Sequence, residues 1–303
     1  MKRPTAVRNA LTEAKGIAAG MPELLIEAHR VSATVLAGWH GRRTAGRGET
    51  FWQFRPFVAG ETTSAIDWRR SARDDHVYVR EKEWEATHTV WLWADLSPSM
   101  DFRSRLAPVT KRRRAMALLL ALAESLAAAG ERIGLLGVSN PILARNASER
   151  VAAFLPDADA MAAFPDTHTL KRFTDLVLIG DFLDPIADIE VTLDAILKAG
   201  TRAHLVQVID PIEETFPYAG RTEFHDPETG LRHVVSRAEQ YREDYQARLA
   251  AVRDRMTTLC RRVDWTFVIH RTDRPATEPL LSLYARLADR ANSLGGYQGG
   301  RAA

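Results

Sequence analysis

Oxygen-bearing side chains follow two apolar segments of the sequence, each where a strand is predicted to end. Asp95, Ser97 and Ser99 stand in the sequence D-L-S-P-S-M, directly after the first segment. Asp181 ends a second apolar segment, L-I-G-D-F. Because parallel strands end at one edge of a sheet, these side chains are expected to face one point. Two carboxylates and two hydroxyls are hard oxygen ligands, so the sequence predicts a site for one Mg²⁺ ion that keeps several waters.

A purely structural role for the same residues stays open. Asp95 and Ser97 are residue types that cap helices and hold turns, because their side-chain oxygens accept hydrogen bonds from nearby backbone N–H groups. The short motif does not decide between this role and metal binding.

From about residue 85 onward, short apolar runs alternate with segments of helical period. The predicted strands are His88–Asp95, Arg132–Ser139, Thr174–Asp181, Arg202–Asp210 and Trp265–His270. The predicted helices are Thr110–Ala129, Asp188–Lys198 and Arg237–Arg262. Strands that are apolar throughout are typical of a sheet buried on both faces. The sequence therefore predicts an α/β fold, a doubly wound and mainly parallel sheet with helices on both faces.

The first 85 residues differ in character, since six of the seven tryptophans lie between positions 39 and 93. We expect a helix from Pro22 to about Val35, a loop rich in Gly and Arg, and extended segments near residues 50–58 and 76–83. The loop carries Arg42, Arg43 and Arg47, which could grip phosphate but are interpreted as solvated. The predicted organisation is an extension over residues 1–84, an α/β domain over 85–290 and a disordered tail over 291–303.

Composition excludes several functional classes. The 303 residues carry 41 Lys and Arg against 39 Asp and Glu, so the net charge favours neither nucleic acid nor an anionic membrane. A single cysteine, Cys260, cannot form an intrachain disulfide. No apolar stretch approaches the roughly 20 residues that span a bilayer. We therefore expect a cytoplasmic protein without direct membrane insertion.

The D-x-S-x-S motif, with an Asp at the end of a later strand, resembles the metal-ion-dependent adhesion site of von Willebrand factor A-type domains. The resemblance implies that Ser97 and Ser99 bind the metal directly, that Asp95 and Asp181 support it, and that a partner's acidic side chain completes the shell. In that family a threonine in a Gly-rich loop is a further ligand. Here Thr167 and Thr169 are the substitutes, and neither has the glycine context.

A second stretch, residues 49–83, resembles the signature of the family called domain of unknown function fifty-eight. The matching positions are Glu49, Phe51, Arg55, Phe57, Gly60, Glu61, Ile66, Asp67, Trp68, Ala72, Arg73, Val79, Arg80 and Glu81. The later sequence D-P-I-E-E-T-F-P, Asp210–Pro217, is similar to a second motif of that family. The resemblance implies a von Willebrand A-like domain whose partners are an AAA+ ATPase of the MoxR type and a client protein.

The charges of this signature indicate a structural role. Asp67, Arg73 and Arg55 are spaced to form a buried ion-pair network around Trp68. The alternative is an anion or peptide site formed by the arginines of the stretch, Arg55, Arg69, Arg70 and Arg73.

The basic run Lys111–Arg114 opens a helix, where cations oppose the helix dipole. We interpret it as a solvated face, with a partner surface as the alternative.

The sequence therefore predicts a non-catalytic protein-interaction module. The enzymatic alternative is an aspartyl phosphotransferase or phosphatase of the haloacid dehalogenase type, with Asp95 as nucleophile. That chemistry needs a second carboxylic acid two residues later, and Ser97 cannot donate a proton as an acid does.

Overall fold

The computed structural model describes residues 25–36, 51–57, 66–73, 76–82, 88–155 and 164–296. The loop with Arg42, Arg43 and Arg47 lies outside these ranges.

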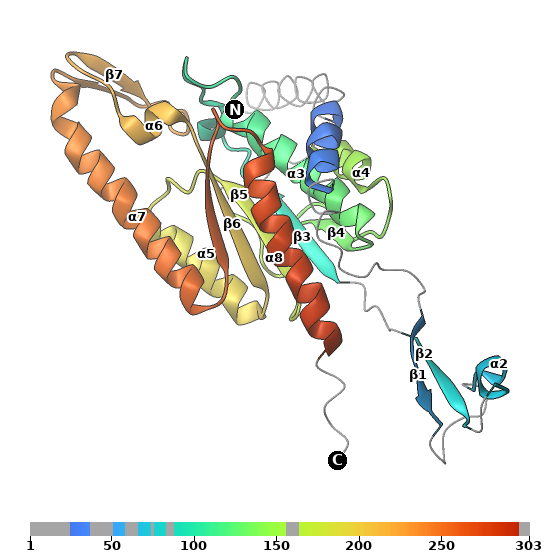
Figure 1. Cartoon of the computed structure of the whole chain (residues 1–303). Helices are drawn as coiled ribbons and strands as arrows, with labels where there is room; N and C mark the ends of the chain where they lie inside the picture. The colour runs from blue at the N-terminus through green and yellow to red at the C-terminus, as the bar shows by residue number, and fades with distance from the viewer. Residues whose placement is uncertain are drawn as a thin grey trace, which may run out of the picture.

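The core of the protein is a five-stranded parallel sheet (Figure 1). Its strands, in spatial order, are β4 (Arg132–Leu135), β3 (Thr89–Ala94), β5 (Asp175–Gly180), β6 (Arg202–Ile209) and β9 (Thr266–Arg271). All neighbouring pairs are parallel, so the predicted α/β fold with a mainly parallel sheet is confirmed. β4 is shorter than predicted because Ser139 N–H donates to the Leu135 carbonyl at 2.9 Å, in a turn where Gly137 has φ 78°.

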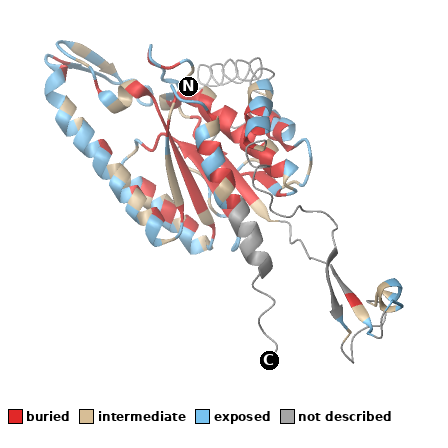
Figure 2. Cartoon of the chain, viewed as in Figure 1, coloured by how far each residue is buried: buried red, intermediate tan, exposed pale blue. Residues whose placement is uncertain are grey.

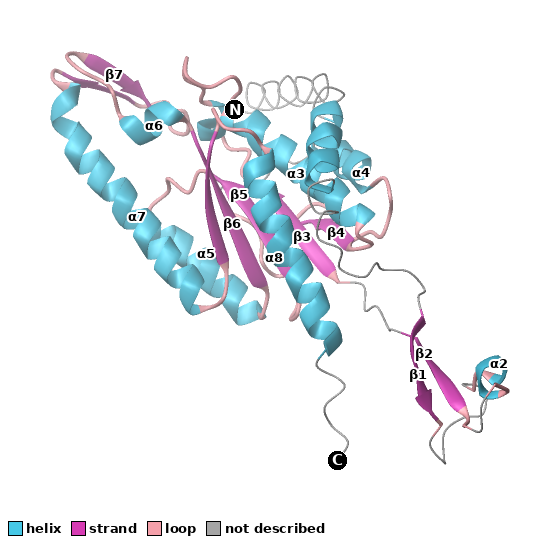
Figure 3. Cartoon of the chain, in the orientation of Figure 1, coloured by secondary structure: helices cyan, strands magenta, loops and turns pink. Residues whose placement is uncertain are grey.

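Helices cover both faces of this sheet (Figure 3). One apolar cluster joins Val90, Leu92 and Ala94 of β3 to α3 (Lys111–Ala128), α4 (Ala147–Phe154), α8 (Thr277–Gly296) and the helical residues 25–36. The other joins Trp91 and Trp93 to α5 (Ile186–Ala199) and α7 (Arg242–Arg262). Because strand side chains alternate between faces, β3 supplies both clusters. Figure 2 shows the buried residues concentrated in the sheet and α3.

The predicted helices lie close to their expected positions. Thr110 caps α3 by accepting a hydrogen bond from Arg113 N–H at 3.1 Å. Gly200 ends α5 with φ 74°, the left-handed conformation that favours glycine. Residues 25–36 pack on α3, where the Ser32 and Ser125 hydroxyl oxygens are 3.0 Å apart. The N-terminal helix therefore shares a core with the sheet.

A separate antiparallel hairpin consists of β1 (Phe51–Pro56) and β2 (Tyr78–Lys82), with the short helix α2 (Trp68–Ser71) between them. Asp67 caps α2 by accepting hydrogen bonds from Arg69 and Arg70 N–H at 3.1 and 2.9 Å. Trp68 is 65% exposed, so the prediction of a buried ion-pair network around it is wrong. Capping of the helix gives the Asp67 carboxylate a structural role through backbone donors. The Arg55 side chain lies outside the described part.

The second hairpin was not predicted: β7 (Thr222–His225) and β8 (Arg232–Val235), which follow α6 (Pro211–Thr215). Its sequence signal is the turn D-P-E-T-G between two short alternating segments. At the other end of the domain, α8 continues to Gly296, past the predicted start of the disordered tail. In the part of the chain that the structure describes, no helix combines the length and apolar character needed to cross a membrane.

Candidate functional site at the carboxyl edge of the sheet

The predicted residues Asp95 and Asp181 follow neighbouring strands. Ala94 of β3 is paired with Ile179 of β5, and Asp95 N–H donates to the Ile179 carbonyl at 2.8 Å. The order of the strands along the chain reverses between β3 and β5, since β4 lies on the other side of β3. Such a reversal opens a crevice at the carboxyl edge, which is where open α/β sheets bind their ligands.

The loop Asp95–Met100 is held by its own side chains. Asp95 Oδ1 accepts a hydrogen bond from Ser97 N–H at 2.8 Å, and the Ser97 and Ser99 hydroxyl oxygens are 3.0 Å apart. Burial raises the pKa of Asp95 to about 6, although the hydrogen bonds from Ser97 lower it; Asp181 and Asp184 raise it further. Three of the four predicted ligands, Asp95, Ser97 and Ser99, are thus linked by hydrogen bonds within one loop.

The fourth predicted ligand, Asp181, already has a cation. Its Oδ2 accepts a hydrogen bond from Lys111 Nζ at 2.8 Å, and its Oδ1 accepts one from Leu183 N–H at 3.2 Å. Lys111 Nζ also lies 2.6 Å from Glu213 Oε1. Burial lowers the pKa of Lys111, but the charges of Asp181 and Glu213 outweigh that effect and raise it above its usual value. The lysine is therefore a buried charged group beside Asp181 at the carboxyl edge.

The motif D-P-I-E-E forms a third part of this site, next to the loop Asp95–Met100 and the Asp181–Lys111 pair. Asp210 and Glu213 form a capping box, in which Asp210 Oδ1 accepts from Ile212 N–H at 2.9 Å and Glu213 Oε2 accepts from Asp210 N–H at 2.9 Å. Asp210 Oδ2 also accepts from Ser104 N–H at 2.8 Å, which ties the segment after the loop to β6. Asp210 and Glu213 thus hold the segments that meet at the carboxyl edge.

The prediction that Lys111–Arg114 is a solvated face is wrong. Lys111, Arg112 and Arg114 are buried. Arg112 donates to the Leu96 and Ser97 carbonyls at 2.7 and 3.3 Å, and its Nε lies 2.9 Å from Asp101 Oδ1. The cause is position: the start of α3 faces the carboxyl edge, where strand-end carbonyls and carboxylates supply partners for buried cations.

Arg114 reaches a different strand end. It donates to the Thr272 carbonyl at 3.2 Å, next to the buried His270 of β9. Burial lowers the pKa of His270 to about 4; the nearby charge of Arg114 lowers it as well, and Asp273 opposes both.

This histidine is expected to make the fold sensitive to acid. The unfolded chain takes up the proton near pH 6.5 and the folded chain near pH 4, so stability is lost as the pH falls through that window. Between pH 7 and pH 5 the wild type should lose about 2 kcal/mol more than His270→Leu. Urea unfolding at the two pH values measures the difference. The matched control, His168→Leu at an exposed position, should behave as the wild type.

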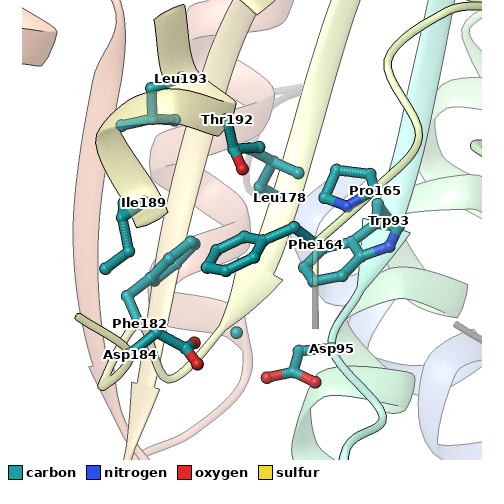
Figure 4. Close-up of a pocket in the computed structure, with 11 residues that line it drawn as sticks. Trp93, Asp95, Phe164, Pro165, Leu178, Phe182, Asp184, Ile189, Thr192 and Leu193 are labelled. Atoms are coloured by element: carbon teal, nitrogen blue, oxygen red, sulfur yellow. The ribbon is translucent and has the colours of Figure 1, made fainter. Parts of the chain in front are cut away.

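An apolar pocket adjoins Asp95 on the α5 side of the sheet (Figure 4). Its walls include the rings of Trp93, Phe164 and Phe182, and the carboxyl groups of Asp95 and Asp184 lie at one end. Phe182 has φ 51°, a conformation that is uncommon for a bulky residue and is often found at functional sites.

The substitute threonines lie in a turn before β5. Thr167 begins a turn in which its carbonyl accepts from Leu170 N–H at 3.1 Å. The chain then enters β5 through Lys171, whose carbonyl accepts from Thr174 and Thr201 at the opposite edge of the sheet. Thr167 and Thr169 therefore lie on the segment between Pro165, which lines a pocket together with Asp95, and Lys171 at the amino edge.

The four predicted Mg²⁺ ligands fit a metal ion only in part. Adjacent ligands of an Mg²⁺ octahedron lie about 3.0 Å apart, which matches the Ser97 and Ser99 hydroxyls. Asp181 does not fit, because its Oδ2 binds the Lys111 ammonium, whose charge opposes a second cation there. Among the described residues, no three His, Cys, Asp or Glu side chains are grouped to hold a metal ion. Mg²⁺ binding stays a prediction from the sequence.

Sequence reasoning missed a carboxylate that contacts the loop. Glu228, in the turn of the β7–β8 hairpin, accepts a hydrogen bond from Ser99 N–H, with Oε1 3.0 Å from the nitrogen. The base of this hairpin is anchored by ring contacts among Phe216, Tyr218, Phe224 and Tyr245. The hairpin therefore brings an acidic side chain to the predicted site.

The chain is similar to a known family and to proteins of two mycobacteria. The model of a family described as protein of unknown function DUF58 matches residues 53–255. Uncharacterized proteins of Mycobacterium tuberculosis (Rv1480) and Mycobacterium bovis (Mb1516) are each 26% identical over 315 residues, covering 97% of this chain and 96% of their own.

Two solved structures were also found, each with 67% of this chain and 99% of its own chain aligned. One is the conserved hypothetical protein BatB from Bacteroides thetaiotaomicron, with 13% identity and a TM-score of 0.34. The other is an aerotolerance-related membrane protein from Bacteroides fragilis, with 12% identity and a TM-score of 0.37.

Proposed function

The chain belongs to the DUF58 family of proteins of unknown function, and from that premise we propose that it is a non-catalytic interaction module that docks a partner protein on the carboxyl edge of its sheet. The partner presents an acidic side chain to the loop Asp95–Met100.

One observation carries this proposal: the loop holds a carboxylate already. Ser99 N–H donates to Glu228 across 129 positions of sequence, so the contact comes from tertiary structure and not from a local turn. A backbone N–H group that points outward from a fixed loop binds a carboxylate from another chain by the same chemistry.

The loop is rigid enough to act as a receptor. Arg112 donates hydrogen bonds to the carbonyls of Leu96 and Ser97, and the Asp95 carboxylate accepts one from Ser97 N–H. With its carbonyls and side chains committed to the protein, the loop keeps its outward N–H group in place, which reduces the ordering cost of binding.

Four exposed apolar side chains lie on the segments that follow Met100 and Asp181 and on the turn of the β7–β8 hairpin. They are Phe102, Leu106, Leu183 and Leu231. Apolar side chains grouped around a few polar contacts are typical of protein-protein interfaces.

The proposal includes a von Willebrand A-like fold, a cytoplasmic location, and a MoxR-type AAA+ ATPase as the partner, with a client protein that the ATPase remodels or assembles. These features come from the sequence resemblance, and the D-x-S-x-S loop at a switch point of a parallel sheet supports the first of them.

The test is native co-purification from the source cells with tagged protein, followed by measurement of Kd for the ATPase recovered. We expect an AAA+ ATPase that binds the wild type. Recovery of no such ATPase would contradict the proposed partner. Turnover of a phosphomonoester, with an aspartyl-phosphate trapped at Asp95, would show the enzymatic alternative instead.

Glu228→Gln is expected to raise the affinity for the acidic partner by about 3- to 10-fold. The carboxylate of Glu228 must leave Ser99 N–H before a partner's acid can bind, and this competition lowers the apparent affinity of the wild type. Glu223→Gln is the matched control, because Glu223 lies on the same hairpin and pairs with Arg232 instead. An unchanged or weaker affinity in Glu228→Gln would show that the two acids do not compete.

A further inference from the structure

Lys111 is an unusual residue to find buried at the edge of a sheet. Its side chain is 1% exposed, whereas lysines are almost never fully buried unless they are paired. Moving an ammonium out of water costs several kcal/mol, which only close opposite charges and hydrogen bonds offset. The two carboxylates at 2.8 and 2.6 Å supply both.

This arrangement joins three distant parts of the chain. Lys111 opens α3, Asp181 follows β5, and Glu213 lies in α6; the two acids are 70 and 102 positions from the lysine. The remaining oxygen of each carboxylate accepts a backbone N–H group, from Leu183 and Asp210 respectively. The lysine with its two carboxylates is therefore a closed set, in which one cation links the loops of the carboxyl edge.

A bound metal ion has this same role where oxygen ligands from separate loops meet. From these contacts we propose that the Lys111 ammonium replaces the metal ion at this edge, so that the site has a permanent cation of its own and needs no Mg²⁺. In that case Asp181, which the sequence predicted to support a metal ion, is expected to bind the ammonium instead.

Two features of the chain agree with this replacement. Asp181, one of the predicted ligands, binds the ammonium, and Glu213 of α6 binds it as well. The Lys111 Nζ also lies 5.9 Å from the centre of the Phe102 ring, in the segment that follows the loop. The replacement of the metal ion by Lys111 does not depend on partner docking at the loop, so either proposal can fail without the other.

Removing the lysine should create a cation site. Lys111→Ala leaves the carboxylates of Asp181 and Glu213 on either side of space that the lysine side chain had filled. Carboxylate and hydroxyl oxygens of this kind suit hard divalent cations such as Mn²⁺ and Mg²⁺.

The experiment titrates Mn²⁺ into both proteins and follows thermal unfolding and calorimetric heat. The wild type should show no binding heat at millimolar Mn²⁺ and the same Tm in EDTA as in Mg²⁺. Lys111→Ala should bind one Mn²⁺, and its Tm should rise by roughly 5 °C once Mn²⁺ exceeds Kd by about 100-fold. Lys198→Ala, which removes an exposed lysine paired with Asp194, is the control and should gain no metal binding.

Two results would overturn the inference. One is a wild type that binds one Mn²⁺ and loses it in Ser97→Ala; this measurement decides the matter even if Lys111→Ala does not fold. The other is a folded Lys111→Ala protein that binds no Mn²⁺.

Discussion

Lys111→Met is expected to lower the free energy of unfolding by about 3–5 kcal/mol. Methionine fills nearly the same space but leaves Asp181 and Glu213 as buried carboxylates with no opposite charge. Guanidinium unfolding of the wild type and the variant at pH 7 measures the loss. Burial already raises the pKa of Glu213, although Lys111 opposes it, so the variant should recover part of its stability at lower pH as the acids take up protons.

The control for charge removal is Lys198→Met. Lys198 pairs with Asp194 one turn away on α5 and its side chain is 77% exposed, so about 0.3–0.5 kcal/mol is expected there. A loss below about 1 kcal/mol in Lys111→Met would mean that the lysine is not the counter-charge of the two acids.

Arg112→Leu is expected to weaken partner binding by at least about tenfold and to lower the free energy of unfolding by about 1–3 kcal/mol. The guanidinium is the donor to the Leu96 carbonyl at 2.7 Å, and leucine leaves that buried acceptor without it. The loop Asp95–Met100 then loses the hydrogen bonds from Arg112 that fix its backbone, and Ser99 N–H is no longer held in position for the partner. Kd for the ATPase and urea unfolding report the two effects.

Arg113→Leu is the neighbouring control. Arg113 is partly exposed and lies 3.7 Å from Glu27, away from the loop. It should change Kd little. Equal losses of binding in the two variants would show that the net charge of the helix start, and not the support of the loop, governs docking.

The strands, the main helices and the loop at the end of β3 could be predicted because their signals are local. Five apolar runs fix five strands, since a strand buried on both faces has few polar side chains. The same logic placed Asp95 and Asp181 at strand ends, and parallel pairing made them neighbours. The β7–β8 hairpin escaped because its strands are short and mostly exposed, so no buried face marks them.

By itself, the sequence determined the α/β alternation, the polar loop at the end of a strand, and the motifs that tie the chain to its family. Only the tertiary structure decided what the charges of that loop do. Helical period does not show whether Lys111 and Arg112 meet water or carboxylates, because both residues stand at the start of α3, where their surroundings come from β5, α6 and the loop itself. The decisive contacts join residues 70, 102 and 129 positions apart, from Lys111 to Asp181, Lys111 to Glu213 and Ser99 to Glu228. Such contacts arise when the strands align, and no local pattern of residues encodes them.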